Sequence, residues 1–145
     1  MISLSMSDCL FCKIIRREIP SYTLYEDEWT YAFLDISPVH PGHALIVPKT
    51  HVTTVLDAEE KVLTSWILAT QKVARAICAT VGVSHFNLLQ NNGSDAGQVV
   101  PHLHMHVIPR HADDGLKHWP HGKDLATEEM QDLAQRIRLF NQQGP

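Results

Sequence analysis

"PHLHMHVIP", residues 101–109, places three histidines at every second position and fills the gaps with leucine, methionine and valine. Successive side chains of a β-strand point to opposite faces of a sheet. The alternation therefore predicts a strand over residues 102–108, with its apolar side chains packed on the core and with His102, His104 and His106 in an open row on the other face. The prolines at both ends disfavour a helix over the same residues.

The residues alone leave three interpretations of this row open. A polar strand face tolerates a single histidine, but strict alternation in a chain that also has Cys9-x-x-Cys12, His43 and His51 argues against mere tolerance. A His-x-His pair on a strand can hold zinc when a further ligand completes the set. A neutral imidazole, with an ordinary pKa of about 6.5, keeps a lone pair at pH 7 and can attack phosphorus to form a covalent intermediate. Flanking imidazoles would then donate a proton or stabilise negative charge.

The pattern around this stretch predicts an α+β fold. Helical spacing runs from a capping box of Asp57 and Glu60 to a stop signal at Gly82. A second amphipathic helix runs from Thr127 to about Asn141. The remaining strand-like segments are residues 22–26, 30–34, 43–48 and 85–91. Strands in succession, with one helix inserted and one appended, favour a largely antiparallel sheet.

The length and composition suit one globular domain. A chain of 145 residues can bury one core, and we expect a flexible tail over residues 1–7 followed by a single domain over residues 8–145. The formal net charge is −4 and there is no basic tract, which argues against a nucleic-acid duplex as a partner. Small anionic ligands need only a local positive potential, so they stay possible.

No apolar stretch reaches the roughly 18–20 residues of a membrane span, and the start of the chain lacks the pattern of a signal peptide. We therefore expect no membrane partner and a cytoplasmic location, whether the natural chain begins at Met1 or Met6. Cysteines are mostly reduced in that compartment, which favours metal ligands or redox thiols at Cys9 and Cys12. Cys78, on the apolar side of the long helical pattern, is expected in the core.

Several segments of the chain, taken in order, resemble one known family. HLHMHVI (102–108) is similar to the His-φ-His-φ-His-φ-φ motif of the histidine triad (HIT) superfamily of nucleotide hydrolases and transferases, where φ is apolar. CLFCKIIRREIPS (9–21), YAFLDISPVHPGHALIVPKTH (31–51) and NNGSDAGQVVPHLHMHVIPR (91–110) resemble the corresponding segments of Hint-like and bacterial HIT proteins. The resemblance covers about residues 8–122. It implies a HIT-like fold, with a mainly antiparallel five-stranded sheet, one long helix and a C-terminal helix.

The resemblance implies roles for the histidines. His104 would be the nucleophile that takes the nucleotidyl group from the α-phosphorus of a substrate. His106 would form hydrogen bonds with the phosphate oxygens. His102 and His43 would lie beside the nucleophile and orient or polarise the site.

Substrate contacts are implied in the same way. Asp35 would accept hydrogen bonds from both ribose hydroxyls, a role that suits an anionic acceptor; the alternative is that it caps the turn before Ser37. Asn91 and Gln98 would lie near the phosphate. The apolar slot for the base would be formed by Phe11, Ile14, Ile19 and Ile36, each of which taken singly is typical of plain core.

One position departs from the family pattern. Val99 stands where many relatives have serine or threonine, whose hydroxyl touches the phosphate or the leaving group. Its absence should cost one hydrogen bond, on the order of 1 kcal/mol, and should alter the leaving-group preference without affecting the nucleophile.

Cys9, Cys12, His51 and His102 make up a Cys₂His₂ set, a composition that tetrahedral zinc prefers. Their spacing does not prove that they converge. The resemblance to bacterial HIT proteins that bind structural zinc implies that they do. His102 would then anchor the strand to the metal and also flank the nucleophile. No organic cofactor is expected.

The family resemblance also implies a symmetric homodimer whose sheets join across the interface. The segment HWPHG, residues 118–122, is similar to a Trp-Pro segment of Hint-like proteins. Trp119 would accordingly reach the active site of the partner subunit.

Together these expectations predict a purine nucleoside phosphoramidase-type hydrolase or transferase. It would act on an AMP-type nucleotide at the α-phosphate through a covalent nucleotidyl-histidine intermediate. The alternatives are a dinucleoside polyphosphate hydrolase of the Fhit type, a nucleotide-binding regulatory module with vestigial catalysis, and zinc-dependent hydrolysis at the triad itself.

Overall fold

The computed structural model describes residues 8–117, 120 and 122–144, which fall into two compact units, residues 1–114 and 115–145. The tail expected over residues 1–7 lies outside the described residues, and a single domain over residues 8–145 stays a prediction. The helices are α1 (Leu10–Ile15), α2 (Glu60–Val81) and α3 (Thr127–Asn141), with short 3-10 helices η1 (Val55–Asp57) and η2 (Ser94–Ala96). The strands are β1 (Thr23–Glu26), β2 (Thr30–Leu34), β3 (Ala44–Pro48), β4 (His85–Leu89) and β5 (Met105–Arg110).

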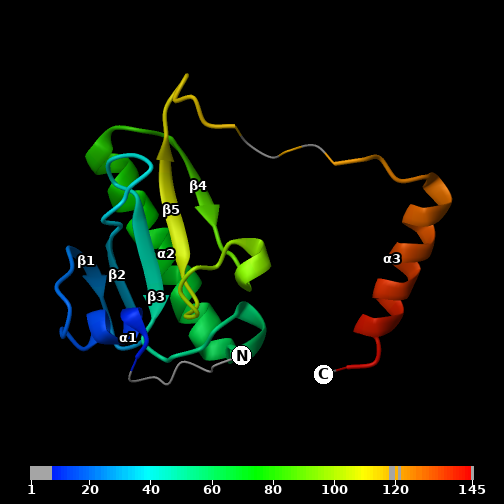
Figure 1. Ribbon diagram of the computed structural model, residues 1–145, viewed down its shortest axis with the longest axis horizontal. Helices are drawn as coiled ribbons and strands as arrows, with labels where there is room; N and C mark the ends of the chain where they lie inside the picture. The colour runs from blue at the N-terminus through cyan, green and yellow to red at the C-terminus, as the bar shows by residue number, and fades with distance from the viewer. Residues whose placement is uncertain (1–7, 118–119, 121, 145) are drawn as a thin grey trace. The chain divides into compact units, whose positions relative to one another are not determined.

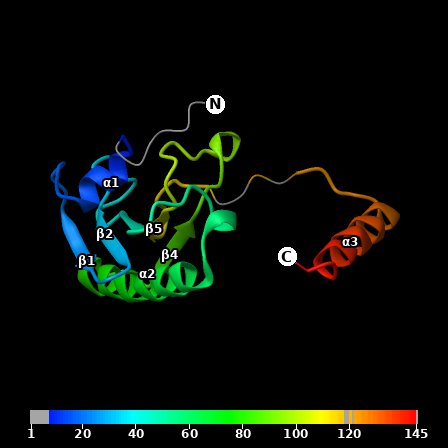
Figure 2. The ribbon, with the colours of Figure 1, turned by 90° about the horizontal axis from the view of Figure 1, so that it is seen from below.

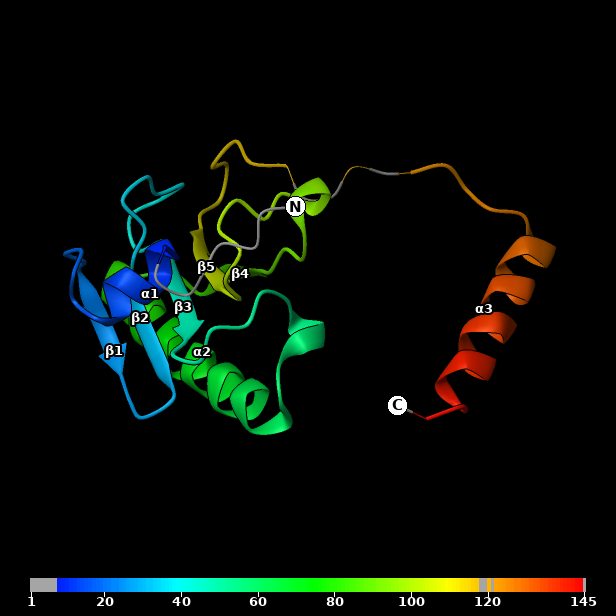
Figure 3. The same cartoon turned by 60° about the horizontal axis from the view of Figure 1, so that its bottom comes forward.

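The strands form one antiparallel sheet in the order β1-β2-β3-β5-β4 (Figure 1), which confirms the predicted α+β class. Figure 3 shows the labelled strands in this order. Strands β2 and β3 pair over their whole length, from Thr30 with Pro48 to Leu34 with Ala44. Strand β5 pairs with β3 on one side and with β4 on the other. The histidine stretch therefore leads into an interior strand, whose backbone is held from both sides.

Helix α2 covers one face of the sheet, and α1 lies on the other face (Figure 2). The apolar residues of α2 recur at steps of three and four, so one side of this helix is apolar and faces the sheet. That side supplies the main core together with Ala32, Ala44, Ile46, Leu103, Met105 and Val107. The helix ends where predicted, because Gly82 adopts the left-handed conformation (φ 73°) and donates its N–H to the carbonyl of Cys78.

The predicted strand over residues 102–108 is wrong at its start. Strand β5 begins at Met105, so His102 and His104 precede it. The N–H of Leu103 donates to the carbonyl of Val52, 2.7 Å away, and Pro101 has no N–H to offer a ladder. The chain therefore reaches β5 through an irregular segment instead of an extended strand.

The prediction that the histidines form an open row is also wrong. His102 is 0% exposed and His104 5% exposed, while His106 is partly buried. The alternation still has the predicted consequence on the other side, because Leu103, Met105 and Val107 pack in the core with α2. What the sequence pattern missed is the layer that covers the histidines.

The predicted capping box of Asp57 and Glu60 is wrong as well. The carboxylate of Asp57 instead accepts hydrogen bonds from the backbone N–H (3.0 Å) and the hydroxyl (2.7 Å) of Thr54. This box caps η1, and α2 begins after Glu59 with no side-chain cap. Thr54 and Asp57 have the same three-residue spacing as Asp57 and Glu60, and this pair forms the box.

In the C-terminal unit, α3 has the predicted bounds, Thr127–Asn141. The carboxylate of Glu129 accepts a hydrogen bond from the backbone N–H of Ala126, 3.0 Å away. This bond satisfies one of the backbone donors that a helix leaves unpaired at its start.

Candidate active site and metal cluster

The candidate site lies on the face of the sheet that carries α1. A second core cluster fills this layer between the helix and the strands. Its buried members are Cys9, Phe11, Cys12, Ile14, Tyr31, Phe33, Leu45 and Val47. The four histidines predicted for catalysis reach this layer from the loop before β3 and from the segment around the start of β5.

One ring nitrogen of His104 is tied to the backbone. Its Nδ1 lies 2.6 Å from the carbonyl oxygen of His102, and because a carbonyl only accepts, Nδ1 carries the hydrogen. Burial lowers the pKa of His104, so the ring is neutral at pH 7. A neutral ring with its hydrogen on Nδ1 has its lone pair on Nε2. The edge of the Phe11 ring lies against this imidazole, with ring centres 5.1 Å apart.

His43 and His106 form a directed pair. The backbone N–H of Val39 donates to Nδ1 of His43 (3.1 Å), so the hydrogen of the neutral His43 ring is on Nε2. That Nε2 lies 2.9 Å from Nδ1 of His106 and donates to it. Burial lowers the pKa of His43 and lowers that of His106 to about 4, so both rings are neutral at pH 7. His106 consequently carries its hydrogen on Nε2 and is a donor at that atom.

Asp35 lies beside this pair. One carboxylate oxygen accepts a hydrogen bond from the backbone N–H of Ser37 (2.8 Å), which is the turn-capping role that the sequence left as an alternative. The other oxygen lies 3.6 Å from Nε2 of His43. Asp35 therefore already caps a turn, and its second oxygen is placed among the histidines.

Cys9, Cys12, His51 and His102 converge, as predicted. Their ligand atoms all lie within 4.8 Å of one another. Nδ1 of His102 is 3.4 Å from Sγ of Cys9 and 3.2 Å from Nδ1 of His51. Nε2 of His102 donates to the carbonyl of Pro48 (2.8 Å), which leaves the lone pair of Nδ1 facing the thiols.

The donor set of this cluster fits a metal ion. Two thiols and two imidazoles match a closed tetrahedral zinc site, and the lone pair of His102 is already aimed inward. Burial lowers the pKa of His102 to about 4 and, with the neighbouring Cys9, raises that of Cys12 to about 11. Without a cation the thiol of Cys12 thus stays protonated at pH 7, and a metal ion would favour the thiolate.

The loop over residues 91–98 is braced by its own amide side chains. Gln98 accepts a hydrogen bond from the N–H of Gly93 and donates one to the carbonyl of Thr53, both at 2.7 Å. Asn91 donates to the carbonyl of Gly97 at 3.4 Å. These bonds hold the loop against the segment after β3. Val99, next to Gln98, is 91% exposed.

Comparison with known proteins identifies the family of the chain. Residues 16–113 match the HIT domain family. The chain belongs to the HIT family. It is 42% identical over 77% of its length to the adenosine 5'-monophosphoramidase of Saccharomyces cerevisiae, covering 70% of that protein. A crystal structure of a HIT family member from Bacillus subtilis is 42% identical with a TM-score of 0.84, covering 90% of this chain and 95% of that one. The crystal structure of a Zn-bound histidine triad family protein from Mycobacterium smegmatis is 33% identical with a TM-score of 0.73. This match covers 86% of this chain and 88% of that one.

In this HIT domain the residues predicted for the base slot have different environments. Phe11 and Ile14 are buried and Ile19 is partly buried, whereas Ile36 is 85% exposed. Phe33 was not among the predicted residues, and its ring meets the Phe11 ring edge-on, with ring centres 5.6 Å apart. Its position two residues before Asp35 on a strand was the available signal, because alternate residues share a face. Trp119 lies outside the described residues.

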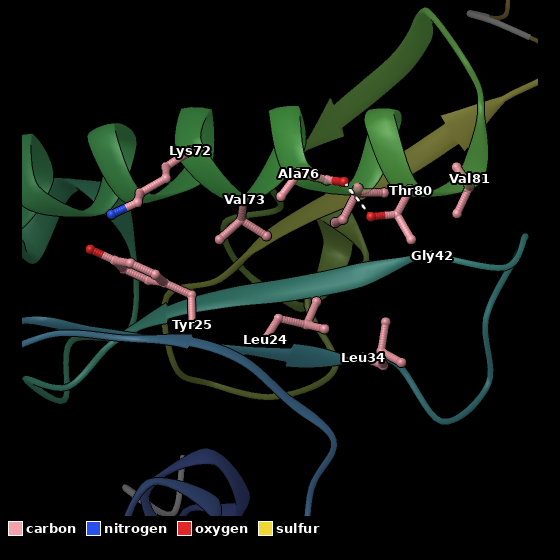
Figure 4. A pocket seen from close by; sticks show the side chains of 10 residues that line it. Leu24, Tyr25, Leu34, Gly42, Lys72, Val73, Ala76, Thr80 and Val81 are labelled. Atoms are coloured by element: carbon pink, nitrogen blue, oxygen red, sulfur yellow. Dashed lines mark hydrogen bonds between the residues drawn. The ribbon is translucent and has the colours of Figure 1, made fainter.

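A separate cavity of the HIT domain, of about 470 Å³, lies between α2 and strands β1 and β2 (Figure 4). Its apolar walls include Leu24, Leu34 and Ile77, and Lys72 stands at one end over the Tyr25 ring. Because α2 covers the face of the sheet opposite the histidines, this cavity is no part of the candidate site. Among the described residues, none of the helices combines the length and the apolar character needed to cross a bilayer.

Proposed function

We propose that the chain is a nucleotide hydrolase of the purine nucleoside phosphoramidase type, which attacks the α-phosphorus through His104. The observation that carries the proposal is the bond from Nδ1 of His104 to the carbonyl of His102. It holds a neutral imidazole with its lone pair on Nε2, as a nucleophile at phosphorus requires. The named activity of the yeast relative, an adenosine 5'-monophosphoramidase, supports this reaction class.

The reaction divides into two displacements. Nε2 of His104 forms a bond to the α-phosphorus while the bond from phosphorus to the leaving group breaks, and the leaving group departs with the electron pair and takes up a proton from solvent. In the second step water attacks the same phosphorus and gives up a proton to solvent, the bond to Nε2 breaks, and nucleoside monophosphate is released. Each half is easier than direct attack by water, because imidazole is both a better nucleophile and a good leaving group.

The remaining residues assist these steps. Nε2–H of His106 donates to a phosphate oxygen or to the leaving group, and Nε2–H of His43 keeps His106 in the required tautomer. The second oxygen of Asp35 accepts bonds from the ribose hydroxyls. Asn91 lies near the phosphate. Gln98 holds the loop and has one amide hydrogen left for a phosphate oxygen, since its other two hydrogen bonds are internal.

Zinc is part of the proposal, bound by Cys9, Cys12, His51 and His102. When bound, it supplies a positive charge that stabilises the thiolates and ties α1 to the segment before the nucleophile. The zinc-bound relative from Mycobacterium smegmatis supports the choice of metal. The proposal assigns no chemical step to this ion and no role to an organic cofactor.

We also propose a cytoplasmic homodimer joined at the edge of the sheet formed by β4. Phe86 and Leu88 on this edge strand are 41% and 44% exposed. With Ile67 and Cys78 of α2 they line an apolar groove of about 530 Å³, and Cys78, predicted as core, is only partly buried there. A second copy would cover both the apolar side chains and the unpaired strand edge. Sedimentation of the wild type as a dimer and of Leu88→Glu as a monomer is the expected result.

The decisive experiment traps the intermediate. Protein mixed briefly with adenosine 5'-monophosphoramidate and quenched in base should carry an acid-labile nucleotidyl group on His104 by mass spectrometry. His104→Ala should carry none and should lose turnover by at least about three orders of magnitude while still binding AMP. Unchanged turnover in His104→Ala would refute the assignment, and activity that is lost on chelation with no trappable adduct would favour zinc-dependent hydrolysis instead.

The leaving group is tested by assaying adenosine 5'-monophosphoramidate and diadenosine polyphosphates side by side. The proposal expects a higher kcat/KM for the phosphoramidate. The opposite order would favour a hydrolase of the Fhit type. Tight AMP binding with no turnover of either substrate would favour a regulatory module.

A further inference from the structure

A small pocket of about 150 Å³ lies at one end of the apolar layer beneath α1. Ile14 and Ile19, both predicted for the base slot, form part of its wall. The rest of the lining is unusual for an apolar slot, because it includes three residues with hydroxyl groups, Ser21, Thr23 and Tyr31. The pocket therefore combines a wall of two predicted slot residues with a polar end.

The three hydroxyls form one cluster centred on Tyr31. The phenol oxygen of Tyr31 lies 3.0 Å from Oγ of Ser21 and 2.6 Å from Oγ1 of Thr23. Each hydroxyl has one hydrogen and two lone pairs. The two mutual bonds use two of the three hydrogens, so the cluster keeps one hydrogen and several lone pairs for a further partner.

A row of ring contacts links the cluster to the predicted nucleotide site. The ring centres of His104 and Phe11 are 5.1 Å apart. Those of Phe11 and Phe33 are 5.6 Å apart, and those of Phe33 and Tyr31 are 5.9 Å apart. Tyr31, Phe33 and Asp35 are alternate residues of one strand and its continuation, so they follow one another along one face. A ligand with its phosphate at His104 and its ribose at Asp35 would extend its base along Phe33 toward the hydroxyls.

The charge at this pocket does not suit an anion. The pocket contains one cationic side chain, Arg17, whose guanidinium lies 6.0 Å from the centre of the Tyr31 ring. Arg17 is already paired with the carboxylate of Glu26 at 2.6 Å. Its charge is thus balanced locally, and the pocket offers an apolar wall with neutral hydrogen-bonding groups, as the edge of a base requires.

We propose that the Ser21–Thr23–Tyr31 hydroxyl cluster reads the edge of the base and selects purines that carry a hydrogen-bonding group at C6. Hydroxyls turn to donate or accept, so the cluster accepts an amino group or a carbonyl at this position. It disfavours a purine with hydrogen there, which leaves the hydroxyls without their partner. This inference rests on the proposed function, since it takes the predicted nucleotide site as the source of the base.

The test compares AMP with purine riboside 5'-monophosphate, which lacks the 6-amino group, by calorimetric titration. Wild-type protein should bind AMP about fivefold more tightly, the effect of one ordinary hydrogen bond. In Tyr31→Phe, which removes the partner shared by both hydroxyl bonds, the ratio should fall to about one. The matched control is Tyr22→Phe, because Tyr22 is the neighbouring tyrosine and is 70% exposed; it should keep the wild-type ratio.

The double variant Ser21→Ala/Thr23→Val provides a second test that does not alter the buried phenol ring. It should lower the ratio as Tyr31→Phe does, and it decides the matter if Tyr31→Phe fails to fold. Equal affinity of the wild type for the two nucleotides overturns the inference while leaving nucleotide binding, and hence the proposed function, intact. A variant that folds and keeps the wild-type ratio overturns it in the same way. Binding of neither nucleotide by the wild type would remove the proposed function together with the inference.

Discussion

Two neighbouring groups of histidines differ in the backbone partner that fixes each ring. At the Cys₂His₂ group, the carbonyl of Pro48 accepts a hydrogen bond from Nε2 of His102, and the lone pair of Nδ1 faces the thiols. At the second group, the N–H of Val39 occupies the lone pair of His43, and a hydrogen faces His106. A carbonyl partner thus leaves a lone pair on the other ring nitrogen, whereas an N–H partner leaves a hydrogen there for a hydrogen bond.

This difference matters because distance alone does not separate the two groups. Asp35, His43 and His106 also bring three potential ligand atoms within 4.8 Å of one another. A metal ion bound there through Nε2 of His43 would have to displace the hydrogen on that atom or break the bond from Val39. The four potential ligands around His102 therefore keep an imidazole lone pair for a metal ion, whereas the three around His43 are already engaged in hydrogen bonds.

The largest expected effect is on the zinc content of the purified protein. Cys12→Ser removes a thiolate that the tetrahedral set needs, so zinc content should fall from about one per chain to near zero. The affinity loss should exceed about 100-fold, the upper range for disturbing an outer partner of a ligand. Elemental analysis of the purified protein measures it. Cys78→Ser is the matched control, since Cys78 lies outside the cluster; zinc-free wild-type protein with full activity would end the zinc proposal.

The next prediction is a loss of activity without a loss of zinc, on changing His43. His43→Ala removes the donor that sets the tautomer of His106, so kcat should fall by about 100-fold, the lower range for loss of proton-transfer assistance. Zinc content should not change, because His43 is no part of the cluster. Steady-state assays and elemental analysis on one preparation give both values. Loss of zinc in His43→Ala would contradict the division into two groups.

A smaller effect concerns pH. Burial lowers the pKa of His106 to about 4, against about 6.5 in the unfolded chain. The unfolded state binds the proton more readily, so His106 contributes stability that is fully present above pH 6.5 and is lost as the pH falls toward 4. The slope should stay below about 1.4 kcal/mol per pH unit, because the ring is only partly buried and solvent reduces the penalty.

Urea midpoints of the wild type and of His106→Asn, measured between pH 4 and 7, isolate this contribution. The variant lacks the titrating group, so its midpoint should fall less steeply toward acid pH. Parallel curves would show that protonation of His106 does not lower the stability of the protein. Histidines that do not contact His106 titrate alike in both proteins, so their contribution cancels in the difference, whereas that of His43, which loses its partner, does not.

Local pattern was enough to predict most of the fold. The bounds of β2 and α3, the end of α2 at Gly82 and the packing of Leu103, Met105 and Val107 all follow from side-chain periodicity and from the conformational freedom of glycine. The start of β5 did not follow, because it depends on the bond from Leu103 to Val52, which is far away in the sequence. The periodicity of side chains does not report where a backbone N–H finds its partner.

For the site, residue types were predictable and tautomers were not. Cys9 and Cys12 could be named from their spacing, and His51 and His102 were implied by the family resemblance; the structure brings the four together. Which nitrogen of each histidine carries the hydrogen depends on backbone groups such as those of Val39 and Pro48. Any residue can supply a backbone group, so no sequence pattern marks it.

The smallest expected effect is a gain at Val99. This side chain is 91% exposed beside the loop over residues 91–98, so Val99→Ser should leave the free energy of unfolding nearly unchanged. A serine there adds a hydroxyl that can donate to the phosphate or to the leaving group. One hydrogen bond of ordinary strength should raise kcat/KM for adenosine 5'-monophosphoramidate by about fivefold. Val99→Ala is the control, because it shortens the side chain without adding a donor. Equal rates for the serine and alanine variants would mean that position 99 does not face the reacting phosphate.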